Sequence, residues 1–237
     1  MRYKQTVLGV VWALFQPLTQ TFVFTIFFGR LAKVPSGDLP YSLFVLIGLV
    51  FWTFFSGALT NASNSLVGNV GVVKKVYFPR IILPISSIVT GFVDFLIALI
   101  ILIIYSFYLG ISPHPLIIVF IPLFLLITSL GAGGLGLFLS ALNVKYRDVR
   151  YVLPFFIQIL LFVSPVIYPT SIVRPSNRII LALNPVTGVV ESMRTLFEGS
   201  TAINWNILGI STLFAVIYFL FGLYFFKATE RFFADVV

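Results

Sequence analysis

The sequence predicts an all-α integral membrane protein with six transmembrane helices and two short re-entrant helices near the outer face. The first observation is composition: 59% of the 237 residues are hydrophobic and only 9% are charged, whereas about a quarter of the residues of a soluble domain are charged. The second is the length of the apolar runs, because about 20 apolar residues let one helix cross the hydrocarbon core of a bilayer. These runs lack the period-two alternation of transmembrane β-strands, so a membrane barrel is not expected.

The apolar runs place the spans along the chain, and the basic residues orient them. We expect spans near residues 9–29, 41–62, 81–109, 115–142, 152–168 and 207–226, in a single transmembrane domain over residues 1–237. The first run continues to Phe28 without a small-residue cleavage site, so we interpret it as a span and not as a signal peptide. With both termini on one side, that side holds ten of the 15 Lys and Arg residues. The positive-inside rule therefore predicts cytoplasmic termini and a place in the inner (cytoplasmic) membrane.

The net charge of +8 does not indicate nucleic-acid binding, because the basic residues are too few and too scattered to form a phosphate-binding stripe. Such charge on an apolar chain is typical of proteins whose loops meet lipid head groups. Cysteine is absent, which excludes disulfides and thiol ligands.

The segment between the last two spans, residues 169–206, is far longer than a turn requires. Ser176 can cap a short apolar helix over residues 178–183, and Asn184-Pro185 can open a second helix that Gly199 ends. Both helices are too short to cross a bilayer.

The second of these helices carries Glu191, Arg194 and Glu198 at spacings of three and four residues, so their charges can pair with one another. We predict that residues 169–199 form a re-entrant outer hairpin whose charged side faces the exit. A plain surface loop is the alternative.

The sequence contains no motif that indicates an enzyme. There is no phosphate-binding loop, no pair of carboxylates and no H-E-x-x-H motif, so we expect no cofactor and no metal site in this chain. Gly131, Gly133 and Gly136 spell G-x-G-x-x-G, but they stand within an apolar span with no preceding strand. We interpret them as small residues that let helices approach closely.

Asp94 is the only acid deep inside a predicted span. An intramembrane acid can serve a proton relay, which would make the chain a proton-coupled carrier. A relay needs further titratable partners, and none stands at that depth in the sequence, so a structural acid is the favoured interpretation.

Aromatic residues are in excess, with 27 phenylalanines. Trp12, Phe15 and Phe22 share one helical face of the first span, and Phe44, Phe51 and Phe55 share one face of the second. Rings that face a pore can stack on the apolar faces of sugars and hold a sliding polymer weakly. Contact with lipid is the alternative.

Several motifs together resemble the membrane subunits of ABC-2 type polysaccharide exporters, which serve O-antigen, capsule or teichoic-acid export. The resemblance covers essentially the whole chain and rests on motifs in the order of the family. These motifs are Arg2-Tyr3-Lys4-Gln5-Thr6 with Gly9, Trp12 and Pro17; Val73–Arg80 with Leu83-Pro84; Tyr146-Arg147-Asp148; Ser164–Pro169; and Asn184-Pro185 followed by Glu191 and Arg194. Family members usually carry an amphipathic interface helix before the first motif. Here Met1 almost adjoins that motif, so we expect truncation or another start site.

The resemblance implies a homodimer of six-span subunits with a channel along the two-fold axis, which moves a lipid-linked polysaccharide from the cytoplasm across the membrane. Each subunit would contact a separate ATP-binding subunit, which would hold ATP and Mg²⁺. For that contact the resemblance indicates Lys74, Lys75, Tyr77, Phe78, Arg80, Lys145, Arg147, Asp148 and Arg150. The expected channel aromatics are Trp12, Phe15, Phe22, Phe51, Phe55 and Tyr168. The expected outer gate comprises Pro169, Asn184, Pro185, Glu191, Arg194 and Glu198. An ABC-2 efflux permease for a small lipid or a drug is the nearest alternative.

Overall fold

The computed structural model describes residues 7–76, 78–146 and 148–230, with the side chains of residues 7–14 and of Lys74 outside the description. These residues form helices and no strand, which confirms the predicted all-α class. The elements are α1 (Val7–Phe24), η1 (Thr25–Leu31), α2 (Tyr41–Gly68), α3 (Val70–Lys75), α4 (Ile82–Tyr108), α5 (Ile117–Lys145), α6 (Val149–Val163), η2 (Thr170–Ile172), α7 (Pro175–Ala182), α8 (Pro185–Phe197) and α9 (Trp205–Glu230).

Four helices among the described residues are long and apolar enough to cross a membrane, namely α2, α4, α5 and α9. The other two predicted spans correspond to α1, which continues as the π-helix η1, and to α6, which is apolar but only 15 residues long. That α1 and α6 also cross the bilayer remains a prediction.

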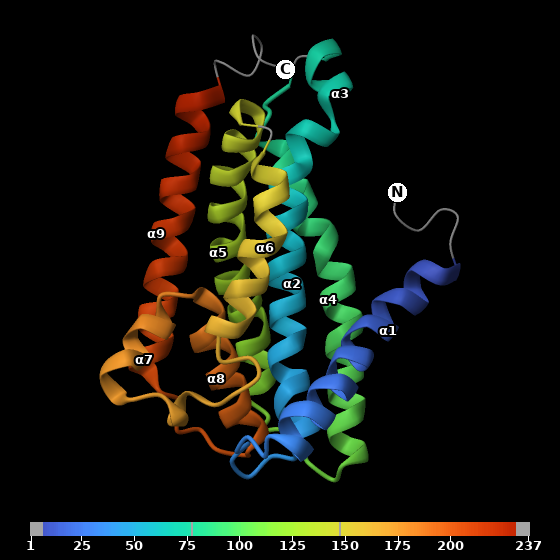
Figure 1. The fold of residues 1–237 in the computed structure, drawn as a ribbon, viewed down its shortest axis with the longest axis vertical. Coiled ribbons are helices and arrows are strands. Elements are labelled where there is room, and N and C mark those ends of the chain that lie inside the picture. Colours follow the sequence, from blue (N-terminus) through green and yellow to red (C-terminus); the bar gives the residue numbers. More distant parts are fainter. Residues whose placement is uncertain (1–6, 77, 147, 231–237) are drawn as a thin grey trace.

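The centre of the bundle is α2. It packs against α4 on one side and α5 on the other, and α5 in turn packs along α9 (Figure 1). Nearly every side chain from Leu43 to Phe55 is buried, as expected of a helix that is apolar on all sides. At the edge of the bundle, α1 diverges from the other helices toward its N-terminal end (Figure 1).

Small residues bring α5 into close contact with its neighbours. A Cβ on Gly134 would lie 2.2 Å from the carbonyl carbon of Tyr218, and a Cβ on Gly222 would lie 2.0 Å from the carbonyl oxygen of Gly134. Added Cβ atoms would also reach 2.6 Å from Pro185 at Gly131 and 2.7 Å from Ala62 at Gly136. The interpretation of these glycines as packing residues is therefore confirmed.

The bundle has two distinct ends (Figure 1). At the hairpin end lie α7, α8 and the connection between η1 and α2. At the α3 end lie α3, the connection between α5 and α6, and the last turn of α9. The two segments predicted to contact an ATP-binding subunit, around residues 74–80 and 145–150, are thus at the opposite end of the molecule from the predicted hairpin.

The close approach of α5 and α9 predicts that Gly222→Ala destabilises the protein by about 1–3 kcal/mol, because the added methyl group has no space. Gly209→Ala, in the same helix, is the matched control, since nothing lies within 4 Å of its Cβ position. We expect this control to leave stability unchanged or slightly raised. Equilibrium unfolding in detergent–SDS mixtures measures both, and equal effects would contradict the packing described.

Candidate functional site

The candidate site lies at the hairpin end, where α6 breaks. The helix ends at Val163, and the amide of Ser164 makes the last helical bond, to the carbonyl of Leu160 at 2.8 Å. Pro165 has no amide hydrogen to donate and disfavours helix at the residue before it. The chain from Ser164 to Pro169 is therefore not helical but forms turns and bends, and the polar backbone groups of this non-helical segment need partners from elsewhere, because unpaired groups in an apolar bundle cost several kcal/mol each.

Arg194 of α8 supplies donors to this non-helical segment. Its side chain is buried, with 6% exposed. Nη1 donates to the carbonyl of Pro165 and Nη2 to the carbonyl of Val166, both at 2.7 Å. The guanidinium group thus replaces the amides that an unbroken helix would have offered to these carbonyls.

The same guanidinium group binds α2. Its Nε and Nη2 atoms donate to the carbonyl of Phe44 at 3.3 and 3.2 Å, and its carbon atom lies 3.4 Å from the centre of the Phe44 ring, within the range of a cation–π interaction. Gly48 makes the space, since a Cβ there would lie 3.1 Å from Nη2 and 2.9 Å from the carbonyl oxygen of Val166. Arg194 therefore joins α8, α2 and the broken end of α6.

Two further side chains complete the binding of the non-helical segment. The hydroxyl of Tyr41 donates to the carbonyl of Ile167 at 2.8 Å. Nδ2 of Asn184 donates to Oγ of Ser164 at 2.5 Å, while Oδ1 of Asn184 accepts from the amide of Val186 at 3.0 Å. The predicted helix start at Asn184-Pro185 is confirmed, and the cap residue has a second role in holding the segment.

One detail of the predicted hairpin is corrected. The first helix, α7, begins at Pro175, so Ser176 lies inside it and donates to Oδ1 of Asn177 instead of capping it. Pro175 starts this helix because its fixed φ suits the first helical position. The side chains of Val190, Met193 and Phe197 are buried within the bundle, while Ile179 and Ile180 of α7 are more than half exposed.

The predicted pairing of Glu191, Arg194 and Glu198 along one charged face is wrong. No ion pair joins these three described side chains; Arg194 points into the bundle, because the carbonyls of the broken helix bind it there. Glu191 instead accepts a short hydrogen bond from the hydroxyl of Thr170 in η2.

Glu198 lies at the end of α8, near the connection that contains Gly37 and Asp38. Partial desolvation raises the pKa of its carboxyl, the charge of Asp38 raises it further, and Arg194 opposes both. Pro169, the remaining predicted gate residue, lies just before η2.

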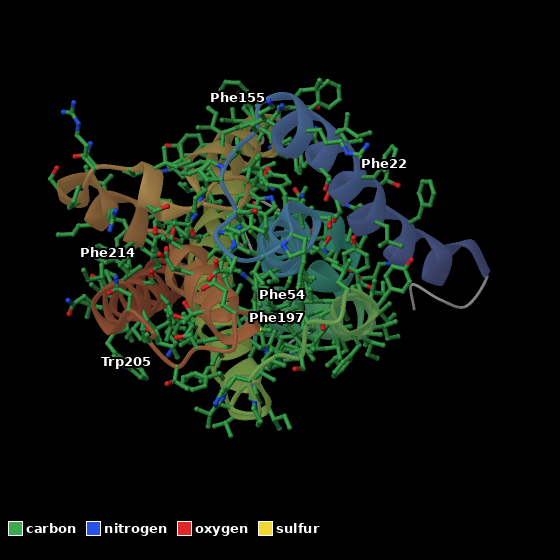
Figure 2. The ribbon with its side chains drawn as sticks, turned by 90° about the horizontal axis from the view of Figure 1, so that it is seen from below. Phe22, Phe54, Phe155, Phe197, Trp205 and Phe214 are labelled. Atoms are coloured by element: carbon green, nitrogen blue, oxygen red, sulfur yellow. The ribbon has the colours of Figure 1, made fainter. Side chains whose placement is uncertain are left out.

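The predicted channel aromatics fall into two groups. Phe51 and Phe55 are 0% and 1% exposed inside the core of one chain, so their assignment to a channel surface is wrong; they pack between helices, as do Phe54 and Phe197 (Figure 2). Phe15 and Phe22 are 55% and 66% exposed on α1, and Phe22 points away from the bundle (Figure 2).

The two remaining residues predicted to line the channel are Tyr168 and Trp12. Tyr168, in the non-helical segment, is partly exposed and its hydroxyl donates to the carbonyl of Val163 at 2.8 Å. The side chain of Trp12 lies outside the described residues.

Of the residues predicted to contact an ATP-binding subunit, those that the structure describes lie on α3, just after it, or around the α5–α6 connection, and these elements are at the same end of the bundle (Figure 1). Lys75, Lys145, Asp148 and Arg150 are exposed, and Phe78 and Arg80 are partly buried. Tyr77, Arg147 and the side chain of Lys74 lie outside the described residues.

Two cations on either side of the α5–α6 connection, at the end of α5 and the start of α6, lie over neighbouring rings. Nζ of Lys145 is 5.2 Å from the centre of the Tyr146 ring, and the guanidinium of Arg150 is 4.8 Å from that of Tyr151. Asp94, the acid of the carrier alternative, is partly buried on α4. No group of three or more His, Cys, Asp or Glu residues able to hold a metal occurs among the residues described.

Comparison with known proteins shows which protein family the chain is similar to. Residues 1–197 match the model of the family described as ABC-2 type transporter. The chain is 26% identical over 238 residues to the O-antigen export system permease protein RfbA of Klebsiella pneumoniae, covering 100% of this chain and 90% of the relative. It is 27% identical to RfbA of Myxococcus xanthus over 83% of this chain and 75% of the relative. It is 24% identical to the polysialic acid transport protein KpsM of Escherichia coli over 90% of this chain and 83% of the relative.

The arginine site predicts a large loss of stability for Arg194→Gln, about 3 kcal/mol or more, because hydrogen bonds from a charged donor are worth roughly 1.5–3 kcal/mol each. Arg194→Lys should recover only part of it, since one ammonium group cannot reproduce the planar fork. Arg174→Gln, at an exposed arginine next to α7, is the control, with a change within about 0.5 kcal/mol. Equilibrium unfolding measures the three, and a loss no greater for Arg194→Gln than for the control would contradict the site.

Proposed function

Because the chain belongs to the ABC-2 type transporter family, we propose that it is the transmembrane subunit of an ATP-driven exporter that moves a lipid-linked polysaccharide out of the cytoplasm. The observation that carries the proposal is the breadth of the match to polysaccharide exporters. Relatives named for O-antigen export and polysialic acid transport align with 83% to 100% of this chain. The likeness thus includes both the α3 end and the hairpin.

The packing of the chain supports a conduit built from two copies. Large side chains fill the core between α2, α4 and α5. The ring centre of Phe51 there lies 5.3 Å from that of Phe95 and 6.3 Å from that of Phe124. A polysaccharide cannot pass through an interior packed at this density. The conduit therefore lies between two protomers of a homodimer, with the exposed rings of Phe15 and Phe22 as candidate lining residues.

The α3 end supports a contact with two copies of an ATP-binding subunit that hold ATP and Mg²⁺. Helix α3 projects from the bundle (Figure 1), and its surface exposes Val72 at 46% and, just after it, Val76 at 57%. Exposed apolar residues flanked by Lys75 suit a cleft on a protein partner. In this proposal the α3 end faces the cytoplasm, and the hairpin forms the outer gate.

Reconstitution tests the function. In vesicles, the chain together with its ATP-binding subunit should move a lipid-linked polysaccharide across the membrane only with ATP, and the chain alone should hydrolyse no ATP above background. Transport by the chain alone would contradict the proposal, and so would transport of small lipids or drugs with no transport of the polysaccharide.

The contact at the α3 end has its own prediction. Val76→Asp should weaken co-purification with the ATP-binding subunit at least tenfold, because a charge replaces an apolar contact, and should leave the stability of the isolated chain unchanged. Val76→Thr, which keeps the shape, is the control and should retain most of the binding. If Val76→Asp binds as well as the unchanged chain, α3 is not the contact.

A further inference from the structure

Helix α9 holds the turn between α7 and α8. Ser211 of α9 is fully buried. Its Oγ accepts from the amide of Gly188 at 3.0 Å and approaches the carbonyls of Ala182 and Asn184 at 3.0 and 3.3 Å, to which its hydrogen can donate. One hydroxyl therefore binds both the end of α7 and the first turn of α8.

A second hydroxyl of α9 binds the same turn. The hydroxyl of Tyr218 donates to the carbonyl of Leu183 at 3.1 Å. The consecutive carbonyls of Ala182, Leu183 and Asn184 thus all have partners on α9. Backbone contact is equally close, since a Cβ on Gly188 would lie 2.8 Å from Cα of Leu208.

The other end of α9 is bound to the loop that follows α3. The amide of Arg80 donates to Oε1 of Glu230 at 3.2 Å, and Nη1 of Arg80 donates to the carbonyl of Glu230 at 2.8 Å. The last carbonyls of a helix have no partner within it and carry partial negative charge, so an arginine is favourable there. Arg80 ends the stretch predicted to contact the ATP-binding subunit.

Helix α9 is unbroken over its 26 residues, and the part from Ser211 to Glu230 spans about 28 Å at 1.5 Å per residue. It contains no proline, and the Gly134–Gly222 contact and the rings of Phe138, Phe221 and Phe225 pack it against α5. A packed helix without a break moves as a rigid element, so a displacement at one end reaches the other.

We propose that α9 is a strut, a rigid helix that links the loop at Arg80 to the turn between α7 and α8. In this proposal Ser211 and Tyr218 are positioning residues: they hold the turn closed while the Arg80–Glu230 contact is made, and the turn opens more often when that contact is broken. The inference rests on the proposed function for the meaning of the two ends, as partner contact and outer gate. The mechanical link itself is a property of this chain alone, and it can be measured without a partner, ATP or substrate.

The test uses the full chain in lipid vesicles with one cysteine at Ala182, a fully buried position at the turn, in a chain that otherwise contains none. The rate of modification by a water-soluble maleimide reports how often the turn opens. Arg80→Ala and Glu230→Ala should each raise this rate at least threefold, and Arg80→Lys, which keeps a donor for the Glu230 carbonyl, should restore most of the slow rate. Arg150→Ala, at an exposed arginine in the first turn of α6 at the same end of the bundle, is the matched control and should change nothing.

Two measurements separate the strut from general loosening of the fold. With the cysteine moved to Ala58 in the core of α2, Arg80→Ala should have no effect. With Ser211→Ala and Tyr218→Phe present, the turn should already react fast, and Arg80→Ala should add no further increase. No effect of Arg80→Ala at the turn, an equal effect at Ala58, or an undiminished effect in the double variant would each overturn the proposal. Because this test contains no ATP-binding subunit, a failed export assay and a failed strut are distinguishable.

Discussion

The structure of the hairpin end depends on one interaction, the binding of carbonyl groups by the buried guanidinium of Arg194. Pro165 breaks α6 inside an apolar bundle, and the carbonyls of Pro165 and Val166 would be costly without donors. Arg194 binds both of them together with the carbonyl of Phe44. Because these partners belong to α6 and α2, the position of α8 follows from them. This arrangement also requires a glycine at position 48 of α2, because any side chain at Gly48 would displace the guanidinium or the Val166 carbonyl.

The two connections of the hairpin region to the bundle differ in chemistry and in consequence. Toward α2 the contact is a charged donor on backbone carbonyls, which desolvation makes expensive to separate. Toward α9 it is made by the neutral hydroxyls of Ser211 and Tyr218, which are weaker than charged donors. The hydrogen bonds of the α7–α8 turn with α9 would therefore separate at lower cost than those of Arg194 with α2. Under the proposed function, this ordering gives a physical reason for the α7–α8 turn to open while Arg194 holds α8 on α2.

Much of the fold is predictable from the sequence, because long apolar runs have one stable arrangement in a bilayer, and because Asn184-Pro185 and Ser164-Pro165 carry local signals for a helix start and a helix break. The site is less predictable, because its partners are backbone carbonyls, which every residue has. Helical spacing pairs Arg194 with Glu191 and Glu198, but nothing in the sequence says that the carbonyls near Pro165 come within reach. Phe51 and Phe55 illustrate the same limit: an apolar face predicts burial without saying whether a channel, lipid or another helix covers it. Arg194 stands among buried apolar residues of α8, and this is the signal that could have indicated its burial.

Amide hydrogen exchange of the full chain in lipid nanodiscs tests the central claim, that Arg194 fixes α8 to α2 through the broken end of α6. In the unchanged chain, the amides of residues 186–197 should exchange as slowly as those of residues 43–55, because both helices belong to one packed core. Arg194→Gln should speed exchange in residues 186–197 and in the first turns of α2 together, and it should leave the α5–α9 contact protected. Fast exchange of residues 186–197 in the unchanged chain, or protection of both helices that survives the loss of Arg194, would contradict the account.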